Sequence, residues 1–536
     1  MTSPDAVVIG SGPNGLVAAN LLADAGWSVV VLEEQDTPGG AVRSDDAVLA
    51  GYVHDTFSSF YPLALGSPTI RDLHLEEHGL TWVHAPSVVG HSFPDGRWAV
   101  LHRDRDETAA GLEADAPGDG EAWLRLCSTW DRIGEDLVRS LLTPFPPVRG
   151  GLGLGAKALR HGGFELLRQL VMPARALTEQ LFHGDAARLL VAGNATHADI
   201  GMESPGSAAM GLLLVLLGQT VGFPVPAGGA GQLSAAMVRR LESRGGTVCL
   251  GERAERIRVE GGRAVAVRTA SREVVARRAV VADVSAPALY GGLVPWENLP
   301  GRLRHRMAGF TWDPSTVKVD WALDGPVPWL GAPETAPGTV HVADSLDEIT
   351  LTGAQISAGL VPDRPFLLVG QMATTDPCRA PAGGESLWAY THVPQRVRAD
   401  AAAEGSGVPT VRGTWDAADL DAFADRVESR MEERAPGFRE RIRARRVLGP
   451  HDLESRDRNL AGGALNGGTA SLHQQLVFRP VAGSGRAETP VAGLFLGSAS
   501  AHPGGGVHGA CGSNAARAAL WHDRIRRPVR SLRRQP

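Results

Sequence analysis

A glycine-rich turn near the start of the chain is the feature that most constrains the fold. A short apolar run at residues 6–9 leads into Gly-Ser-Gly-Pro-Asn-Gly at residues 10–15, and a helix-forming stretch follows. A second apolar run, residues 28–32, ends in Glu33, which stands eighteen positions after the last glycine of the motif. This order of strand, glycine turn, helix, strand and acidic residue predicts a dinucleotide-binding βαβ unit.

Each position of the motif has a chemical role in binding a dinucleotide. Gly10 permits the tight turn, Gly12 lets a pyrophosphate approach the backbone, and Gly15 lets the helix pack close to the strand. The helix N-terminus offers unpaired N–H groups and a partial positive charge to phosphates. Glu33 can accept hydrogen bonds from a ribose diol. The residues that we expect to bind the cofactor here are Gly10, Gly12, Pro13, Asn14, Gly15, Glu33 and Glu34.

A second glycine pair, Gly39 and Gly40, follows shortly after the second apolar run. It allows another close approach between backbone and cofactor, which the long FAD molecule needs and a simple nicotinamide enzyme does not. Arg43 comes next in the chain and either neutralises a phosphate or remains a solvated loop arginine. The two glycine motifs together favour FAD as the cofactor.

The composition narrows the class of protein. The 536 residues suffice for two or three domains, and 43% apolar with 21% charged residues are ordinary for a globular enzyme. The formal net charge of −6 is small for this length and argues against nucleic-acid binding. The four cysteines are scattered and form no Cys-x-x-Cys pair, so we expect neither a metal site nor a redox disulfide.

The location of the protein is predicted from its apolar segments. The first expected strand starts too near Met1 to leave room for a signal peptide, and the longest apolar run, residues 208–218, is shorter than the roughly 18 residues of a membrane span. We therefore expect a cytoplasmic protein. Peripheral membrane contact stays open, because residues 202–222 form either a buried helix or a membrane-contacting patch. The arginine-rich residues 524–536 likewise form either a solvated tail or a contact with an anionic membrane.

Four short motifs near the N-terminus carry a family resemblance. They are Val31-Leu-Glu33, Gly39-Gly40, Gly51-Tyr-Val-His-Asp55 and Ser58-Ser-Phe-Tyr-Pro62. Together they resemble the N-terminus of bacterial-type phytoene desaturases, and most closely that of the relatives called pyridine nucleotide-disulfide oxidoreductase domain-containing protein 2. The related amine oxidases usually have Arg directly after the glycine pair, where this chain has Ala41.

A glycine-rich signature at residues 492–516 extends the resemblance to the C-terminus. It begins as a short apolar run, turns through His502-Pro and three glycines, and ends in a helix-forming stretch. In the family it resembles, the backbone near Val507 faces the pyrimidine edge of the flavin and the Gly497 region approaches the pyrophosphate. Ser498 stands where amine oxidases commonly have Glu or Asp. The further cofactor-binding residues that the resemblance implies are Ala254, Gly497, Ser498, Gly505, Gly506 and Val507.

The pattern and the resemblance together predict a mixed α/β fold of the amine-oxidase and phytoene-desaturase type. A Rossmann-like FAD-binding domain is interrupted by a substrate domain with a helical cap and an antiparallel or mixed sheet. The expected segments are 1–75, 224–300 and 451–536 for the FAD-binding domain, 76–223 for the cap, and 301–450 for the sheet and its helices. Residues 316–323 and 386–392 have the alternation of strands, and residues 164–181 have the periodicity of one amphipathic helix.

Three polar side chains are candidates for acid or base catalysis. Tyr390 and His392 stand two apart on an expected strand and share one of its faces. They either line the substrate cavity or are hydrogen-bonded structural residues. His502 either acts as an acid or base beside the flavin or holds the C-terminal turn. The sequence forces no side chain into the role of a catalytic base.

The resemblance implies an FAD-dependent oxidoreductase. Such an enzyme would transfer a hydride between FAD and a small apolar, isoprenoid-like organic substrate, as a dehydrogenase or desaturase or, in reverse, as a saturase. Two alternatives remain open: a flavin amine or amino-acid oxidase on the same scaffold, and a non-catalytic FAD-binding regulatory protein. The substrate, the redox direction, the electron acceptor and the oligomeric state do not follow from the sequence.

Overall fold

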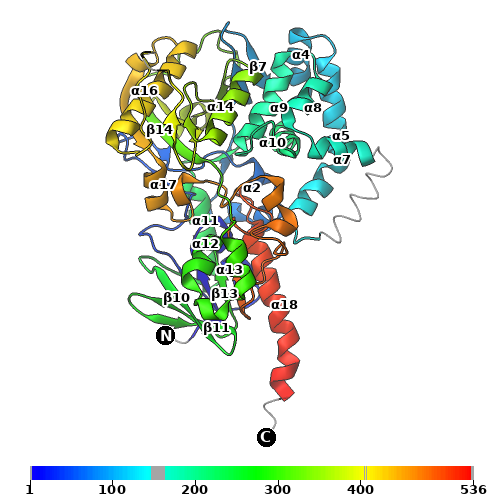
Figure 1. Cartoon of the computed structure of the whole chain (residues 1–536), viewed down its shortest axis with the longest axis vertical. Coiled ribbons are helices and arrows are strands. Elements are labelled where there is room, and N and C mark those ends of the chain that lie inside the picture. The colour runs from blue at the N-terminus through cyan, green and yellow to red at the C-terminus, as the bar shows by residue number, and fades with distance from the viewer. Residues whose placement is uncertain (1–2, 147–162, 404, 406, 533–536) are drawn as a thin grey trace.

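The chain forms two lobes of different architecture. The computed structural model describes residues 3–146, 163–403, 405 and 407–532. The lobe that carries both ends of the described chain, here called the dinucleotide lobe, is built on a parallel sheet (Figure 1). The other, here called the sheet lobe, contains a large mixed sheet and a group of helices. Each lobe is assembled from segments that are distant in the sequence, because the chain crosses between them several times.

In the dinucleotide lobe, five strands of the described chain form a parallel sheet in the order β21-β13-β1-β2-β9. Every residue of β1, β13 and β21 is buried, and their sequences AVVI, AVVA and LFL are apolar on both faces. Strands covered on both sides require this composition. The strands are β1 (Ala6–Ile9), β2 (Val29–Leu32), β9 (Thr247–Cys249), β13 (Ala279–Ala282) and β21 (Leu494–Leu496).

Different layers cover the two faces of this sheet. Alanines of α1 and α18 form one core with the strands, and the two helices pack closely, because a Cβ atom on Gly512 would lie 1.8 Å from the carbonyl oxygen of Asn14. A small antiparallel sheet covers the opposite face. The elements are α1 (Pro13–Asp24), α11 (Gly231–Ser243), α18 (Ala510–Leu532), β10 (Ala254–Glu260), β11 (Arg263–Thr269) and β12 (Glu273–Val275).

The sheet lobe is organised around seven strands of the described residues, in the order β20-β14-β18-β17-β15-β6-β7. Neighbouring strands are antiparallel except β15 and β6, which are parallel. The strands predicted at residues 316–323 and 386–392 are confirmed as β14 and β18. The strands are β6 (Ser87–Ser92), β7 (Trp98–Leu101), β14 (Ser315–Leu323), β15 (Pro337–Val342), β17 (Leu367–Gln371), β18 (Glu385–Val393) and β20 (Ile442–Leu448).

The two faces of this larger sheet differ in chemistry. Successive side chains of a strand point to opposite faces, so alternation in the sequence becomes a difference between faces. On one face, apolar residues such as Val319 and Leu387 pack against α16 (Ala417–Arg434). The opposite face carries Trp388 and Tyr390, which contact the core of the helical cap. The second face, which is polar and aromatic, is therefore the one turned toward the cap.

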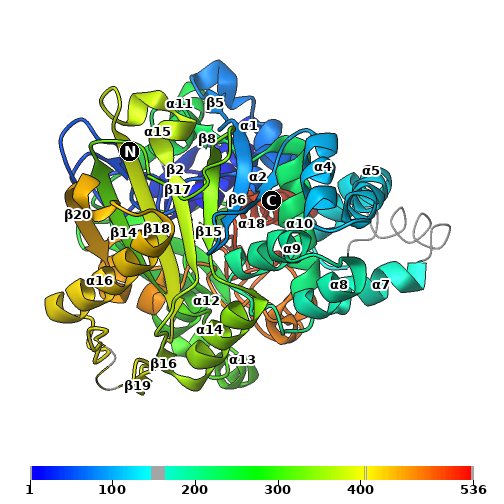
Figure 2. The same cartoon turned by 90° about the horizontal axis from the view of Figure 1, so that it is seen from above.

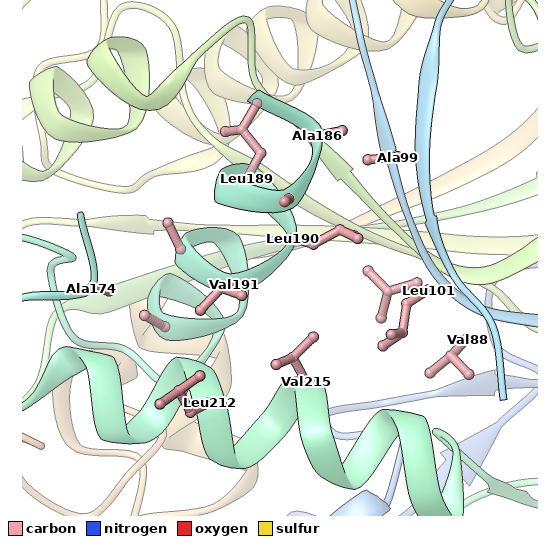
Figure 3. Packing of buried hydrophobic residues seen from close by; sticks show 14 of the residues in the cluster. Val88, Ala99, Leu101, Ala174, Ala186, Leu189, Leu190, Val191, Leu212 and Val215 are labelled. Carbon is pink, nitrogen blue, oxygen red and sulfur yellow. The ribbon is translucent and has the colours of Figure 1, made fainter. Parts of the chain in front are cut away.

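The cap helices gather at one side of the sheet, at the right of Figure 2. α9 and α10 pack against each other and against β6 and β7 through aliphatic side chains, including Leu190, Val215 and Leu101 (Figure 3). α10 is buried over most of its length, which confirms the buried-helix interpretation of residues 202–222. The cap helices are α4 (Arg105–Asp115), α5 (Asp119–Leu142), α7 (Gly163–Val171), α8 (Ala174–Leu181), α9 (Asp185–His197) and α10 (Ser207–Val221).

The single helix predicted at residues 164–181 is wrong, because α7 ends at Val171 and α8 begins at Ala174. Pro173 stands between them and cannot donate a helical hydrogen bond. Side chains of the arginine-rich C-terminal end lie largely outside the described residues. No helix within the described ranges is long and apolar enough to cross a membrane.

The remaining strands and α-helices of the described residues lie outside the two sheets and the cap. They are β3 (Ser44–Asp45), β4 (His54–Asp55), α2 (Pro62–Gly66), α3 (Pro68–Arg71), β5 (Trp82–Val83), β8 (Val225–Pro226), α12 (Ala286–Ala288), α13 (Gly301–Met307), α14 (Leu346–Ala358), β16 (Leu360–Val361), α15 (Met372–Thr375), β19 (Ala399–Asp400) and α17 (Pro450–Arg456).

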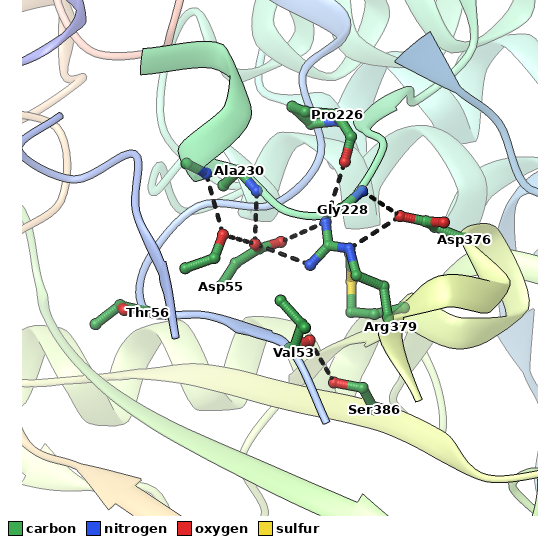
Figure 4. A network of polar contacts seen from close by, with 12 residues as sticks. Val53, Asp55, Thr56, Pro226, Gly228, Ala230, Asp376, Arg379 and Ser386 are labelled. Carbon is green, nitrogen blue, oxygen red and sulfur yellow. Dashed lines mark hydrogen bonds and ion pairs between the residues drawn. The ribbon is translucent and has the colours of Figure 1, made fainter. Parts of the chain in front are cut away.

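A buried arginine joins the two lobes (Figure 4). The Arg379 side chain is fully buried, and it donates to the carboxylates of Asp55 at 3.0 Å and Asp376 at 3.1 Å. Asp55 also accepts the backbone N–H of Ala230, and Asp376 accepts that of Gly228, both at 2.8 Å. The loop that leads into α11 is thereby tied to the sheet lobe through one cation and two carboxylates.

A second set of buried charges lies beside this arginine. Lys318 of β14 donates to the carbonyl oxygen of Asp55 at 2.9 Å and pairs with Asp320. Arg446 of β20 bridges Asp320 at 2.8 Å and Asp45 at 2.6 Å. Each buried charge thus has an opposite charge beside it, as burial in a medium of low dielectric constant requires.

We expect the Arg379→Met variant to lose about 3–5 kcal/mol of unfolding free energy, because it leaves two buried carboxylates without their cation. Denaturant unfolding measures this loss. The control is Arg443→Met, which breaks an ion pair with Asp324 at 2.8 Å where the arginine side chain is 61% exposed. That change should cost about 1 kcal/mol or less. Equal stability of the two variants would contradict the role given to Arg379.

Candidate active site

The carboxyl ends of the parallel strands bring the expected cofactor residues to one edge of the sheet. β1 is followed by Gly10, β2 by Glu33, β13 by Asp283 and β21 by Gly497. Ligands of open α/β sheets bind outside this edge. The N-terminal and C-terminal motifs, which lie at opposite ends of the sequence, therefore form one candidate site.

The first glycine turn has the close packing that its motif predicts. Gly10 has a φ angle of +90°, and a Cβ atom on Gly15 would lie 2.2 Å from the carbonyl oxygen of Gly10. α1 begins directly after Gly12, which provides no side-chain cap, and Pro13 and Asn14 form its first turn. The turn thus presents backbone rather than side chains at the start of the helix, as an anion site needs.

Glu33 does more than the sequence analysis expected. Its buried carboxylate accepts the backbone N–H of Ser11 at 2.8 Å, the Ser11 hydroxyl at 2.6 Å and the backbone N–H of Gln35 at 2.9 Å. A carboxylate has about four acceptor positions, so three bonds leave about one for a ribose hydroxyl. Glu33 therefore orders the glycine turn and keeps about one acceptor position that a ribose hydroxyl could use. Glu34, beside it, pairs with Arg458 at 3.3 Å.

The second glycine pair lies against the first turn. A Cβ atom on Gly40 would lie 3.0 Å from the Cα atom of Gly12. Arg43 donates to the carbonyl oxygen of Arg456 at 2.7 Å and places its guanidinium 5.4 Å from the Phe57 ring centroid. Its Nε is buried and has no hydrogen-bond partner among the described residues. This group is positively charged and incompletely paired, which suits the binding of a phosphate.

Two carboxyl groups that the sequence analysis did not select also face these turns. Asp283 accepts the N–H of Gly15 at 2.8 Å, and its Oδ2 would lie 2.8 Å from a Cβ atom on Gly12. Asp457 would lie 3.2 Å from a Cβ atom on Gly40. Burial raises the pKa of Asp283 to about 8 and that of Asp457 to about 6. Near neutral pH, Asp283 is thus mostly uncharged and does not oppose an anionic ligand.

The C-terminal signature closes the site from the other side. A Cβ atom on Gly497 would lie 3.1 Å from Val281 of β13, so this glycine lets the turn approach the sheet. Ser498 is buried and accepts the backbone N–H of Ser500 at 3.3 Å. Val507 is half-buried and packs against the α1 core, and α18 starts shortly afterwards. Gly505 and Gly506 lie between these anchored ends.

Ala254 follows β9, which is the outermost strand of the parallel sheet on the β2 side. It is the first residue of β10. The preceding segment runs beside the end of β2, where the N–H of Glu33 donates to the carbonyl of Cys249 at 2.9 Å and the N–H of Glu252 donates to that of Glu33 at 2.7 Å. Ala254 therefore follows closely on the segment that flanks Glu33.

The three acid/base candidates occupy two different environments. The Nε2 atom of His502 lies 2.8 Å from the carbonyl oxygen of Thr143 at the end of α5. Burial lowers the pKa of His502. Tyr390 lies edge-on to His392, with ring centroids 5.6 Å apart. His392 places Nε2 at 2.6 Å from Oδ1 of Asp199. The structure thus joins Tyr390 and His392 and ties His502 to the cap.

Sequence reasoning missed Asp199, Asp283, Asp457 and Asn466 as parts of this site. Each of them contacts residues that are far away in the chain, and none belongs to a recognisable motif. The only available signal was the position of Asp283 at the end of a buried apolar run. Within the described ranges, no group of three or more His, Cys, Asp or Glu residues is placed to hold a metal ion.

Comparison with known proteins agrees with this geometry. Residues 8–74 match the family described as an NAD(P)-binding Rossmann-like domain. Pyridine nucleotide-disulfide oxidoreductase domain-containing protein 2 of Rattus norvegicus is 29% identical over 96% of this chain and 92% of the relative. Phytoene desaturase (neurosporene-forming) of Cereibacter sphaeroides is 26% identical over 97% of this chain and 94% of the relative.

A solved structure shows the same fold. The crystal structure of an oxidoreductase from Methanosarcina mazei superimposes with a TM-score of 0.62 at 16% identity, over 96% of this chain and 99% of that one. The fold and the paired glycine turns define the class of FAD-dependent oxidoreductases. Within that class, this chain is similar over almost its whole length to the curated relatives, which include phytoene desaturases.

The residues at the carboxyl edge fit FAD. The glycine turns leave no room for side chains where the cofactor must approach, and Arg43 offers a buried donor without a partner among the described residues. Bound FAD would supply the acceptor or donor of a hydride. The residues that would hold it are Gly10, Gly12, Pro13, Asn14, Gly15, Glu33, Gly39, Gly40, Arg43, Gly497, Ser498, Gly505, Gly506 and Val507.

We expect FAD binding to weaken as the pH rises, because the carboxyl group of Asp283 loses its proton near pH 8 and would then repel the pyrophosphate. The Kd of FAD should rise about tenfold between about pH 7 and pH 9, which corresponds to about 1.4 kcal/mol. Fluorescence titration of the apoprotein with FAD measures this change.

The Asp283→Asn variant should bind FAD with little dependence on pH, because an amide keeps the acceptor for Gly15 and cannot ionise in this range. Asp46→Asn is the matched control, since Asp46 is exposed on the same lobe, and it should keep the native dependence. If Asp283→Asn keeps the native dependence as well, the role given to Asp283 is wrong.

Proposed function

We propose that this protein transfers a hydride between FAD and a carbon atom of a small, largely apolar organic substrate of isoprenoid type. The observation that carries the proposal is the apolar surrounding of the C-terminal glycine turn. A Cβ atom on Gly506 would lie 2.8 Å from the Leu63 side chain, and Leu63 packs against a cluster that contains Leu213 and Leu217 of α10. A hydrocarbon is the ligand that such surroundings stabilise through burial of apolar surface.

Aromatic rings continue these surroundings toward the sheet. Phe60 lies 6.1 Å from Trp388 between ring centroids, and Trp388 stacks on Tyr390 at 5.8 Å. Phe60 and Tyr390 keep part of their surface exposed although they pack against the cap core. The protein's own contribution is to exclude water and to hold the substrate between these rings and α10. The relative from Cereibacter sphaeroides is named for phytoene, an isoprenoid hydrocarbon, which supports the same substrate class.

The reaction is a dehydrogenation or desaturation in one direction and a saturation in the other. The amine-oxidase alternative has less support, because Ala41 and Ser498 depart from the pattern of those enzymes. The alternative of a non-catalytic regulatory protein differs in one measurable respect, since its FAD would not respond to any substrate.

We expect the purified protein to carry FAD, which heat releases and chromatography identifies. Under anaerobic conditions, a saturated isoprenoid substrate should bleach the oxidised flavin, or an unsaturated one should reoxidise the chemically reduced flavin. Gly15→Val is the control without cofactor, since its side chain would clash with the Gly10 carbonyl oxygen. Bleaching by amines alone would favour an amine oxidase, and no response to either panel would favour a non-catalytic protein.

A further inference from the structure

The cap helix α7 exposes an apolar face. The exposed fractions of Phe164, Leu167 and Val171 are 86%, 57% and 46%, and no residue of α7 is buried. Spacings of three and four residues place these three side chains on one face of the helix. A surface helix normally turns such a face toward the core of its own protein. Within the described part of the chain, the apolar face of α7 is left to solvent instead.

A second group of exposed apolar side chains adjoins α7. Leu472, Leu476 and Phe478 are exposed on two short 3-10 helices. Gly206 joins the two groups, because its N–H donates to the carbonyl oxygen of Val171 at 2.9 Å and a Cβ atom on it would lie 2.9 Å from the Leu472 side chain. In both Figure 1 and Figure 2, an orange segment of the ribbon lies between α13 and α7. The 3-10 helices are η7 (Leu472–Gln474) and η8 (Leu476–Phe478).

A basic helix, α13, borders the segment that follows η8. Its Arg306 donates to the carbonyl oxygen of Ala482 at 2.8 Å. α13 also carries exposed Arg302 and Arg304 and contains no acidic residue, and among the described residues these three arginines have no ion-pair partner. The Arg304 guanidinium lies 5.3 Å from the ring centroid of Trp296, whose side chain is exposed as well. Cations and an aromatic ring therefore border the exposed apolar side chains.

The exposed side chains of α7, η7, η8 and α13, together with Trp296, are here called the docking surface. The acidic residues beside them are paired, Glu165 with Arg168 at 2.6 Å and Glu297 with Arg256 at 3.8 Å. The remaining charge of the docking surface is therefore positive. Apolar side chains bordered by Arg and Trp are typical of protein segments that lie in a membrane interface. The positive charge is complementary to anionic lipid headgroups.

The docking surface lies next to the C-terminal glycine turn. η8 is followed directly by Arg479, whose side chain is fully buried and donates to the carbonyl oxygen of Ala499 at 2.7 Å. A Cβ atom on Gly504 would lie 3.3 Å from the Arg479 guanidinium. The N–H of Phe145, just beyond α5, donates to the carbonyl oxygen of Gly485 at 3.0 Å. The docking surface is thus connected both to the expected flavin-binding turn and to the cap.

We propose that the docking surface binds the protein to an anionic phospholipid bilayer. The apolar side chains of α7, η7 and η8 enter the acyl-chain boundary, and the arginines of α13 contact the headgroup phosphates. This surface differs from both membrane contacts that the sequence left open, since residues 202–222 form the buried helix α10 and residues 524–536 are not part of it. The inference goes beyond the proposed function. An isoprenoid hydrocarbon dissolves in the same acyl chains, so a docked protein meets its proposed substrate there.

The test is co-sedimentation of the full-length protein with vesicles of phosphatidylcholine alone or with added phosphatidylglycerol. The native protein should bind the phosphatidylglycerol vesicles more strongly, and added salt should reduce this preference. The double variant Phe164→Ser, Leu167→Ser should bind both kinds of vesicle at least about tenfold more weakly, because it removes apolar surface that enters the bilayer. The double variant Arg302→Gln, Arg304→Gln should bind only the phosphatidylglycerol vesicles more weakly, by at least about fivefold.

Two matched controls change exposed side chains elsewhere. Leu250→Ser alters a leucine that is 43% exposed after β9, Arg443→Gln alters the exposed arginine of β20, and both should bind vesicles like the native protein. All variants should keep the native melting temperature, because they change only exposed side chains. Native binding by both double variants, or no binding of the native protein to either vesicle, would overturn the proposal. So would a dimer in light scattering that Phe164→Ser, Leu167→Ser dissociates, since a second copy would then cover the surface. Vesicle binding decides this proposal independently of the substrate screen that tests the proposed function.

Discussion

The buried contact of Arg379 with Asp55 and Asp376 is the interaction on which the arrangement of the two lobes depends. It fixes the loop that leads from β8 into α11, and so sets the dinucleotide lobe against the larger sheet. Lys318 and Arg446 extend the same principle, since each buried cation has a carboxylate beside it. Because an unpaired buried charge is costly, these pairs favour one relative position of the lobes over others.

The relative position of the two lobes determines how the carboxyl edge of the parallel sheet lies against the substrate-domain residues of the sheet lobe. The carboxyl ends of β1, β2, β13 and β21 supply the glycine turns and carboxyl groups, and α18 packs against α1 through small residues. The same C-terminal turn contacts Leu63 on one side and Asn466 on the other. Hydride chemistry at the flavin would therefore have apolar surroundings and a polar set of residues within reach of the same turn.

His392 shows how neighbouring carboxylates can raise the pKa of a buried histidine. Burial disfavours the charged form of an imidazole, and His197 at the end of α9 accordingly has a low pKa. His392 differs because Asp199 and Asp313 compensate for the lost hydration. His502, another candidate from the sequence, places its Nε2 2.8 Å from a backbone carbonyl at the end of α5, and burial lowers its pKa. The pKa values of these histidines therefore differ because the histidines lie at different positions relative to carboxylates.

The sequence by itself determined the elements whose signals are local. The glycine turn at residues 10–15, the strands β14 and β18, and the glycine signature after β21 follow from periodicity and from the special backbone freedom of glycine. The periodicity of residues 164–181 predicted one helix, and this prediction is wrong because Pro173 divides the stretch into α7 and α8. Only the tertiary structure decided that Asp283 faces Gly15 and that Asp199 meets His392, since these contacts join residues far apart in the chain. Such contacts have no local pattern, because they depend on how the lobes pack rather than on the neighbouring residues.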